Sequence, residues 1–300
     1  MSTQVGQLAE SRTATLARVS GLNWTWSFCR RKPLGGIGLI IIVIIALVAI
    51  FGPFIAPRDP LEINASHLFG GPELIKGNYL GTDHLGRDVL SRIIGGARVS
   101  FFTALISVFS GSAIGVLLGL VSGYYSGWID AVIQRIVDMK MSIPMLVLAL
   151  AIMAVLGQKT QNVIIAIALI QIPQTARVVR SVVVSVKTME FVESARALGA
   201  SDLRILFRHI APQTFAPIII VVTAAMGLAI IIEASLSFLG LGTPPPNPSW
   251  GSMLSGPTLQ NVERAPWNAV FPGVALTLTV FSFNLVGDAL RDVLDPRLRN

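Results

Sequence analysis

A single carboxylate in an otherwise apolar run is the first candidate for chemistry in this 300-residue sequence. Glu233 is the only charged residue between Ile210 and Val262. A charge at the centre of a membrane helix costs about 2.5–3.5 kcal/mol, so Glu233 should face a bundle interior or a water-filled path. Three roles remain open: a pathway residue that meets a cationic group, a polar contact with a partner protein, or a protonated acid hydrogen-bonded within the bundle.

The second candidate is a helix–glycine–helix pattern within residues 177–213. Gly199 stands where a C-capping glycine ends a helix, and Ser201 suits the N-cap of the next helix. Pro212 fits the first turn of the helix that follows. The residues that define the pattern are Glu193, Ser194, Ala195, Gly199, Arg204 and Pro212. The pattern favours a protein-docking surface over a solvated connecting loop.

The usual catalytic motifs are absent from the sequence. None of the lysines follows a glycine, so the Gly-Lys-Ser/Thr of a phosphate-binding loop does not occur. HExxH and GxSxG are also missing. The one cysteine, Cys29, cannot form an intrachain disulfide, and the three histidines are far apart. We therefore expect neither an enzyme nor a chain that holds a metal or cofactor of its own.

The composition indicates an integral membrane protein. Hydrophobic residues make up 53% and charged residues 13%, and the mean hydropathy is +0.70. Soluble domains carry about 25% charged residues, so this chain has too little polar surface for a soluble globule. Its apolar content is also too high for a disordered chain.

Windows without Asp, Glu, Lys or Arg locate the membrane spans, because a helix needs about 20 residues to cross the hydrocarbon core. The predicted spans are Pro33–Pro57, Val99–Ile129, Met141–Gln158, Thr160–Ala176, Phe215–Leu239 and Ala265–Gly287. Helical spacing fits these windows better than the short alternating strands of a barrel. We expect an all-α protein with six transmembrane helices, the first of them an uncleaved signal anchor. Prolines within the windows should kink or break them, notably Pro144, Pro173, Pro217 and Pro272.

Two sequence spacings predict how the helices pack. Three glycines recur at intervals of four in the second predicted span and indicate a close-packing face: Gly111, Gly115 and Gly119. Asp138 and Asp130 lie three and five residues from Arg135, which favours a structural ion pair over a functional role.

The distribution of basic residues predicts the orientation. With a cytoplasmic N-terminus, 16 of the 23 Lys and Arg residues fall on the inner side and 7 on the outer side. This excess satisfies the positive-inside rule and places both termini in the cytoplasm. The same distribution explains the pI of about 10.2, so the basic charge does not indicate a nucleic-acid-binding protein. No basic patch is interleaved with aromatic residues, as it is in proteins that bind single-stranded nucleic acid.

The chain divides into five parts on this basis. They are a cytoplasmic tail (1–32), a first transmembrane helix (33–57), a periplasmic loop with an interfacial helix (58–100), a five-helix core (101–290) and a cytoplasmic C-terminal tail (291–300). Val89, Leu90, Ile93 and Ile94 supply the helical spacing in the loop. That helix is equally well read as the start of the second span.

Two stretches of the inner segment resemble the coupling loop of bacterial ABC importer permeases. ESARALG at Glu193–Gly199 and HIAP at His209–Pro212 match the family pattern of Glu-Ala-Ala, three residues, Gly, nine residues and Ile-x-Leu-Pro. The departures are Ser194, His209 and Ala211. Further stretches resemble the second permease of dipeptide, oligopeptide, glutathione and nickel importers: Leu80–Ser100, Ser235–Leu254 and Phe283–Arg299.

This resemblance, from about Pro33 to Arg299, implies a type I ABC importer permease fold in a bacterial inner membrane. It implies a homologous second permease, two ATPase subunits that bind ATP and Mg²⁺, and a periplasmic or lipid-anchored binding protein. The stretch Glu193–Gly199 would couple to an ATPase, while Glu233 receives no role from the family. The expected cargo is a dipeptide or oligopeptide, with glutathione or nickel as alternatives within the family. A secondary transporter is a further, weaker alternative, because no internal repeat is evident.

Overall fold

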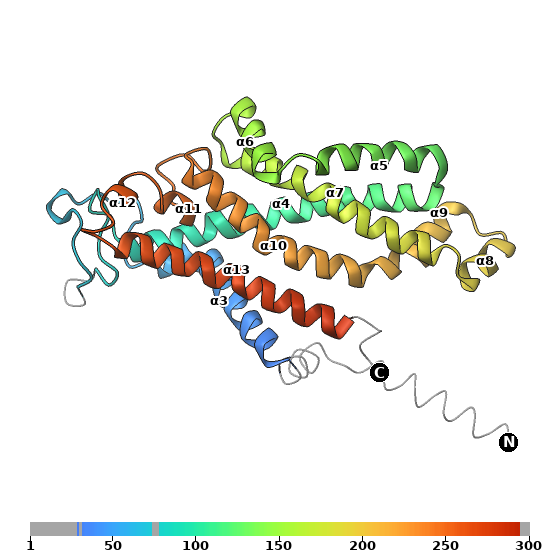
Figure 1. Ribbon diagram of the computed structural model, residues 1–300. Coiled ribbons are helices and arrows are strands. Elements are labelled where there is room, and N and C mark those ends of the chain that lie inside the picture. Colours follow the sequence, from blue (N-terminus) through green and yellow to red (C-terminus); the bar gives the residue numbers. More distant parts are fainter. Residues whose placement is uncertain (1–28, 30–31, 74–77, 295–300) are drawn as a thin grey trace, which may run out of the picture.

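The computed structural model describes residues 29, 32–73 and 78–294, and this part of the chain is an elongated bundle of helices (Figure 1). Its long helices are α3 (Pro33–Ile55), α4 (Val89–Tyr125), α5 (Gly127–Met141), α6 (Met145–Leu156), α7 (Thr160–Val186), α10 (Phe215–Phe238) and α13 (Trp267–Leu294). Its short helices are η1 (Ala65–His67), α8 (Glu190–Ala197), α9 (Asp202–Arg204), η2 (Ile205–Ile210), η3 (Ala211–Thr214), α11 (Trp250–Met253) and α12 (Pro257–Gln260). Most of the predicted N-terminal tail and the last six residues lie outside the described residues.

The helices agree with the predicted all-α class and with six spans. Five of them, counting Asp202–Phe238 as one continuous helix, are long and apolar enough to cross a membrane. The pair α5 and α6 meets the same test only when both are taken together, and the two helices meet at an angle of 90°. The count of six holds when this bent pair forms one span.

The third predicted span, Met141–Gln158, is broken at Pro144, as the position of this proline predicted. Only α6 lies in that window, and its 12 residues extend for about 18 Å at 1.5 Å per residue. Pro144 occupies the N-cap position of α6, where its ring prevents the preceding residues from continuing α5 as a helix. By contrast, Pro173 and Pro272 lie inside α7 and α13, which continue past them.

The segment before the second span is not a separate interfacial helix. Asp88 caps α4 by accepting a hydrogen bond from the backbone N–H of Ser91 at 2.8 Å, and α4 then runs without a break for 37 residues. The interfacial helix predicted within residues 58–100 is therefore the start of α4, which was the alternative interpretation of its apolar spacing.

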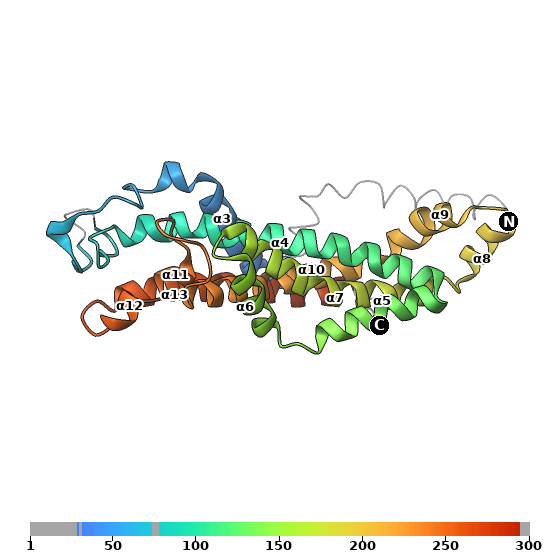
Figure 2. The same ribbon diagram turned by 90° about the horizontal axis from the view of Figure 1, so that it is seen from above.

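The predicted glycine face is confirmed as a packing surface between α4 and α7, which lie side by side along the bundle (Figure 2). A Cβ built at Gly111 would lie 2.4 Å from the carbonyl oxygen of Ala168. A Cβ built at Gly115 or Gly119 would lie 2.7 or 2.6 Å from the nearest atom of α7, and Gly123 extends the series by one turn. The missing side chains let the two helix backbones approach each other.

The prediction that Asp130 and Asp138 pair with Arg135 is wrong, because both carboxylates pair with arginines of α7. Arg180 of α7 donates to both carboxylate oxygens of Asp130, at 2.6 and 2.5 Å. Arg177 of α7 donates to Asp138 at 2.6 Å. Because α5 packs against α7, these arginines reach the carboxylates across the helix interface, where sequence spacing within α5 gives no information. The ion pairs are structural, as expected, and they fasten α5 to α7.

Candidate functional site

The helix–glycine–helix pattern forms an elbow, residues 190–210, at one end of the bundle (Figure 1). Gly199 has a φ of +80°, and its N–H donates to the carbonyl of Arg196 at 3.0 Å. The N–H of Ala200 donates to the carbonyl of Ala195 at 3.1 Å. These two bonds make a Schellman motif, so the predicted C-cap at Gly199 is confirmed.

The second half of the elbow differs in detail from the prediction. Ser201 occupies the N-cap position of α9, but its side chain makes no capping hydrogen bond. Its carbonyl accepts from the N–H of Ile205 at 2.9 Å. Pro212 lies in η3, which leads directly into α10, rather than in the first turn of α10 itself.

The inner face of the elbow is fixed to the bundle. Val192 of α8 and Ile205 of η2 are fully buried, in one apolar cluster with residues of α4 and α7. The Tyr124 hydroxyl of α4 donates to the carboxylate of Asp202 at 2.5 Å. The elbow is thus attached to the same two helices that the glycine face holds together.

The outer face of the elbow combines exposed apolar and charged side chains. Leu198 is 88% exposed and Leu203 is 63% exposed, beside the exposed Phe191 and Phe207. Of the predicted site residues in this region, Ala195 is half-buried and the following are exposed: Glu193, Ser194, Gly199, Arg204 and Pro212. An apolar patch rimmed by charges is typical of a protein-docking surface.

Glu233 lies apart from the elbow, at a junction of α10, α4 and α11. Its side chain is completely buried, and the hydroxyl of Ser237 donates to its Oε1 at 2.8 Å. The hydroxyls of Ser100 and Ser249 also face the carboxyl group. A side chain with no exposed surface does not line a water-filled path in this conformation. This burial agrees with the alternative of an acid hydrogen-bonded within the bundle, while the pathway role and the contact with a partner protein stay predictions.

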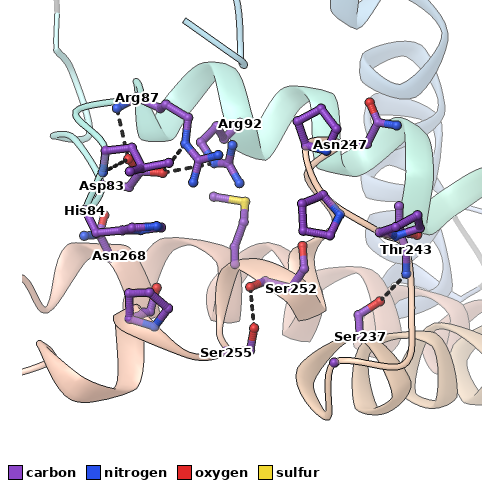
Figure 3. Close-up of a pocket in the computed structure, with 18 of the residues that line it drawn as sticks. Asp83, His84, Arg87, Arg92, Ser237, Thr243, Asn247, Ser252, Ser255 and Asn268 are labelled. Atoms are coloured by element: carbon purple, nitrogen blue, oxygen red, sulfur yellow. Dashed lines mark hydrogen bonds and ion pairs between the residues drawn. The ribbon is translucent and has the colours of Figure 1, made fainter. Parts of the chain in front are cut away.

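At the end opposite the elbow, a cavity of about 460 Å³ lies between the loop that precedes α4 and the loops around α11 (Figure 3). Asp83 binds the backbone N–H of Leu85 and of Arg87 through Oδ1. Its Oδ2 accepts from Nε of Arg87 at 2.7 Å and lies 3.4 Å from Nε of Arg92. Both guanidinium groups are nearly buried in the cavity wall.

The sequence did not predict this cavity, which we call the outer cavity because it lies at the end of the bundle opposite the elbow. The spacing of four between Asp83 and Arg87 is the one signal that could have indicated an ion pair there. His84, on the same wall, has a pKa below its ordinary value because burial disfavours the charged imidazolium. The imidazole of His84 is consequently neutral at pH 7 and adds no charge to the wall.

Comparison with known families supports the predicted resemblance. Residues 115–300 match the family "Binding-protein-dependent transport system inner membrane component". Residues 24–72 match the "N-terminal TM domain of oligopeptide transport permease C".

Individual relatives cover almost the whole chain. The dipeptide transport system permease protein DppC of Alkalihalophilus pseudofirmus is 43% identical, over 90% of this chain and 88% of that protein. The glutathione transport system permease protein GsiD of Escherichia coli O157:H7 is 46% identical, over 91% and 90%.

A solved structure supports the fold. An inward-facing MetNI methionine ABC transporter chain matches with a TM-score of 0.55 at 18% identity, over 68% of this chain and 96% of that chain. This likeness confirms the predicted type I importer permease fold. The family match, the relatives and the apolar helices agree that the chain is a multi-pass permease subunit and not an enzyme. The chain belongs to the family of binding-protein-dependent transport system inner membrane components.

Proposed function

We propose that the chain forms half of the translocation pathway of an ATP-driven importer for dipeptides or oligopeptides. The observation that carries this proposal is the 43% identity to a dipeptide permease over nine-tenths of the chain. A homologous second permease supplies the other half of the pathway. Glutathione is a second candidate cargo, supported by the 46% identity to a glutathione permease over a similar length.

The elbow docks in a groove of one ATPase subunit. The chain has no phosphate-binding loop of its own, so ATP and Mg²⁺ bind on the two partner ATPases. Exposed Leu198 and Leu203 supply an apolar contact, and the surrounding charges supply orientation. Because the inner face of the elbow is packed on α4 and α7, a movement of the ATPase is transmitted to these helices as rigid-body rocking.

The elbow end of the bundle faces the cytoplasm. The start of α3 and the end of α13 are joined by an ion pair between Lys32 and Asp292 at 2.7 Å. Both of these helix ends point toward the elbow end of the molecule (Figure 1). This arrangement supports two cytoplasmic termini, as the basic residues predict. The opposite end, with the outer cavity, faces the periplasmic or lipid-anchored binding protein.

An uptake assay tests the proposed function. The chain would be reconstituted in liposomes with its sister permease, both ATPases and the binding protein, and uptake of labelled dipeptide and of labelled glutathione would be followed. We expect dipeptide uptake that requires ATP inside the compartment where the elbow lies. Uptake of glutathione alone would select the second candidate, and uptake without ATP would contradict an ATP-driven importer.

A further inference from the structure

The two arginines at the outer cavity have hydrogen-bond donors that the protein does not use. Arg87 binds Asp83 through Nε, and within the described residues neither of its Nη atoms has a partner. Arg92 uses Nη1 for a 3.3 Å contact with the carbonyl of Pro60, and its Nη2 is likewise unpaired in that part of the chain. Figure 3 shows both guanidinium groups beside Asp83 on one wall of the cavity.

The charges on this wall do not balance. Among the described residues, Asp83 is the only carboxylate that lines the cavity, and it faces two guanidinium groups. Asp88 does not line the cavity, and its Oδ2 caps α4 by accepting from the backbone N–H and the hydroxyl of Ser91. Because buried charges are stable only when they are paired, the wall has room for one more negative group.

The remaining walls offer acceptors and hydroxyl groups. Asn268 is 4% exposed and lines the cavity, and its Oδ1 has no hydrogen-bond partner among the described residues. Ser252 and Ser255 lie on the wall opposite the arginines (Figure 3). A ligand with a carboxylate at one end and N–H groups at the other would satisfy both the unused donors and the orphan acceptor.

We propose that the outer cavity binds the carboxylate of a small zwitterionic solute, with Arg87 and Arg92 as its donors and Asn268 as the acceptor for an N–H group. A volume of about 460 Å³ lies within the usual range of small-ligand sites. The planar guanidinium fork suits a carboxylate, and charge-assisted bonds of this kind are stronger than neutral ones. The identity of the solute as a peptide rests on the proposed function.

Equilibrium binding to the assembled transporter, in the absence of the binding protein, tests this site. The probes are labelled dialanine, its C-terminal amide and acetate. For the wild type, we expect dialanine to bind at least about tenfold more tightly than the amide, because the amide lacks the charge that the arginines recognise. In Arg87→Gln, dialanine should bind as weakly as the amide, whereas Arg87→Lys should retain part of the preference.

Lys159→Gln is the matched control, since it removes one exposed positive charge beside the cavity residue Gln158 without altering the cavity wall. This variant should keep the wild-type preference, and the size-exclusion profile of every variant reports whether the transporter stays assembled. Equal affinity for dialanine and its amide in the wild type would overturn the proposal, as would an unchanged preference in Arg87→Gln.

Two further outcomes distinguish a failure of the carboxylate site from a failure of the proposed peptide cargo. In the first, the wild type binds acetate but neither binds dialanine nor takes it up, and Arg87→Gln loses the acetate binding. This result would retain the carboxylate site and reject the peptide as its ligand. Normal dialanine binding in Arg87→Gln together with weakened capture of the binding protein would overturn the proposal, because an acidic side chain of that protein would then be the occupant.

Discussion

The Gly199→Val variant is expected to hydrolyse ATP but to lose at least about tenfold in dipeptide uptake, because a left-handed backbone costs a residue with a side chain about 1–2 kcal/mol. Gly199 has a φ of +80° at the turn of the elbow, where valine is strained by its branched Cβ. No atom of the described residues lies within 4 Å of a Cβ built there, so the added Cβ itself meets open space. Its effect is confined to the angle between α8 and α9.

Gly199→Asn is the matched variant for this prediction. Asparagine enters the left-handed region more readily than other residues with a side chain, so it should keep the Schellman motif and most of the uptake. ATP hydrolysis and uptake would be measured in the same proteoliposomes. Normal coupling of the two activities in Gly199→Val would show that the backbone geometry of the elbow does not matter.

A second large effect is expected from Gly111→Leu, which should lower the free energy of unfolding by about 3 kcal/mol or more through overpacking. The new Cβ would lie 2.4 Å from the carbonyl oxygen of Ala168 and 2.9 Å from the side chain of Gln171. Because the first of these neighbours is backbone, α4 and α7 would have to separate. The ion pairs that fasten α5 to α7 would be strained by the same movement. Thermal stability in detergent and the amount of protein in the membrane report this loss.

Gly273→Leu supplies the control for the glycine face. Gly273 lies within α13, and no atom in the part of the chain that the structure describes is within 4 Å of a Cβ built on it. The same gain in side-chain volume should therefore leave the melting temperature and the yield close to those of the wild type. Equal losses in the two variants would mean that the close approach of α4 and α7 is not what makes Gly111 necessary.

Much of the fold can be predicted from the charge-free windows, because a helix that crosses a bilayer needs a long apolar stretch. The prediction for the fifth span ends within one residue of α10, and Gly111 packs as its spacing indicates. The third span was found only in part, because its charge-free window contains α6 but not α5. Half of it is α5, whose carboxylates Asp130 and Asp138 are neutralised by arginines of α7 that are distant in the sequence.

The structure of the elbow could be predicted from the sequence, whereas the cavity at the other end of the molecule could not. The elbow is local, so a capping glycine and a spacing of helical residues were enough to predict its form. The outer cavity joins the loop containing Arg87 with Asn268 near the C-terminus, and the environment of Glu233 joins Ser100 with Ser249. Such groupings arise only when the helices pack, and a single sequence carries no periodic signal for them.

Cysteine cross-linking tests most directly the claim that the elbow couples the permease to an ATPase. Cys29 is the only cysteine in the sequence, so a Cys29→Ser background can carry single probes at Leu198 and, as a control at the opposite end, at Lys159. In membranes that contain the whole transporter, Leu198→Cys should cross-link to an ATPase subunit, whereas Lys159→Cys should not. Failure of the probe at 198 to cross-link, or equal cross-linking from position 159, would contradict the proposed coupling.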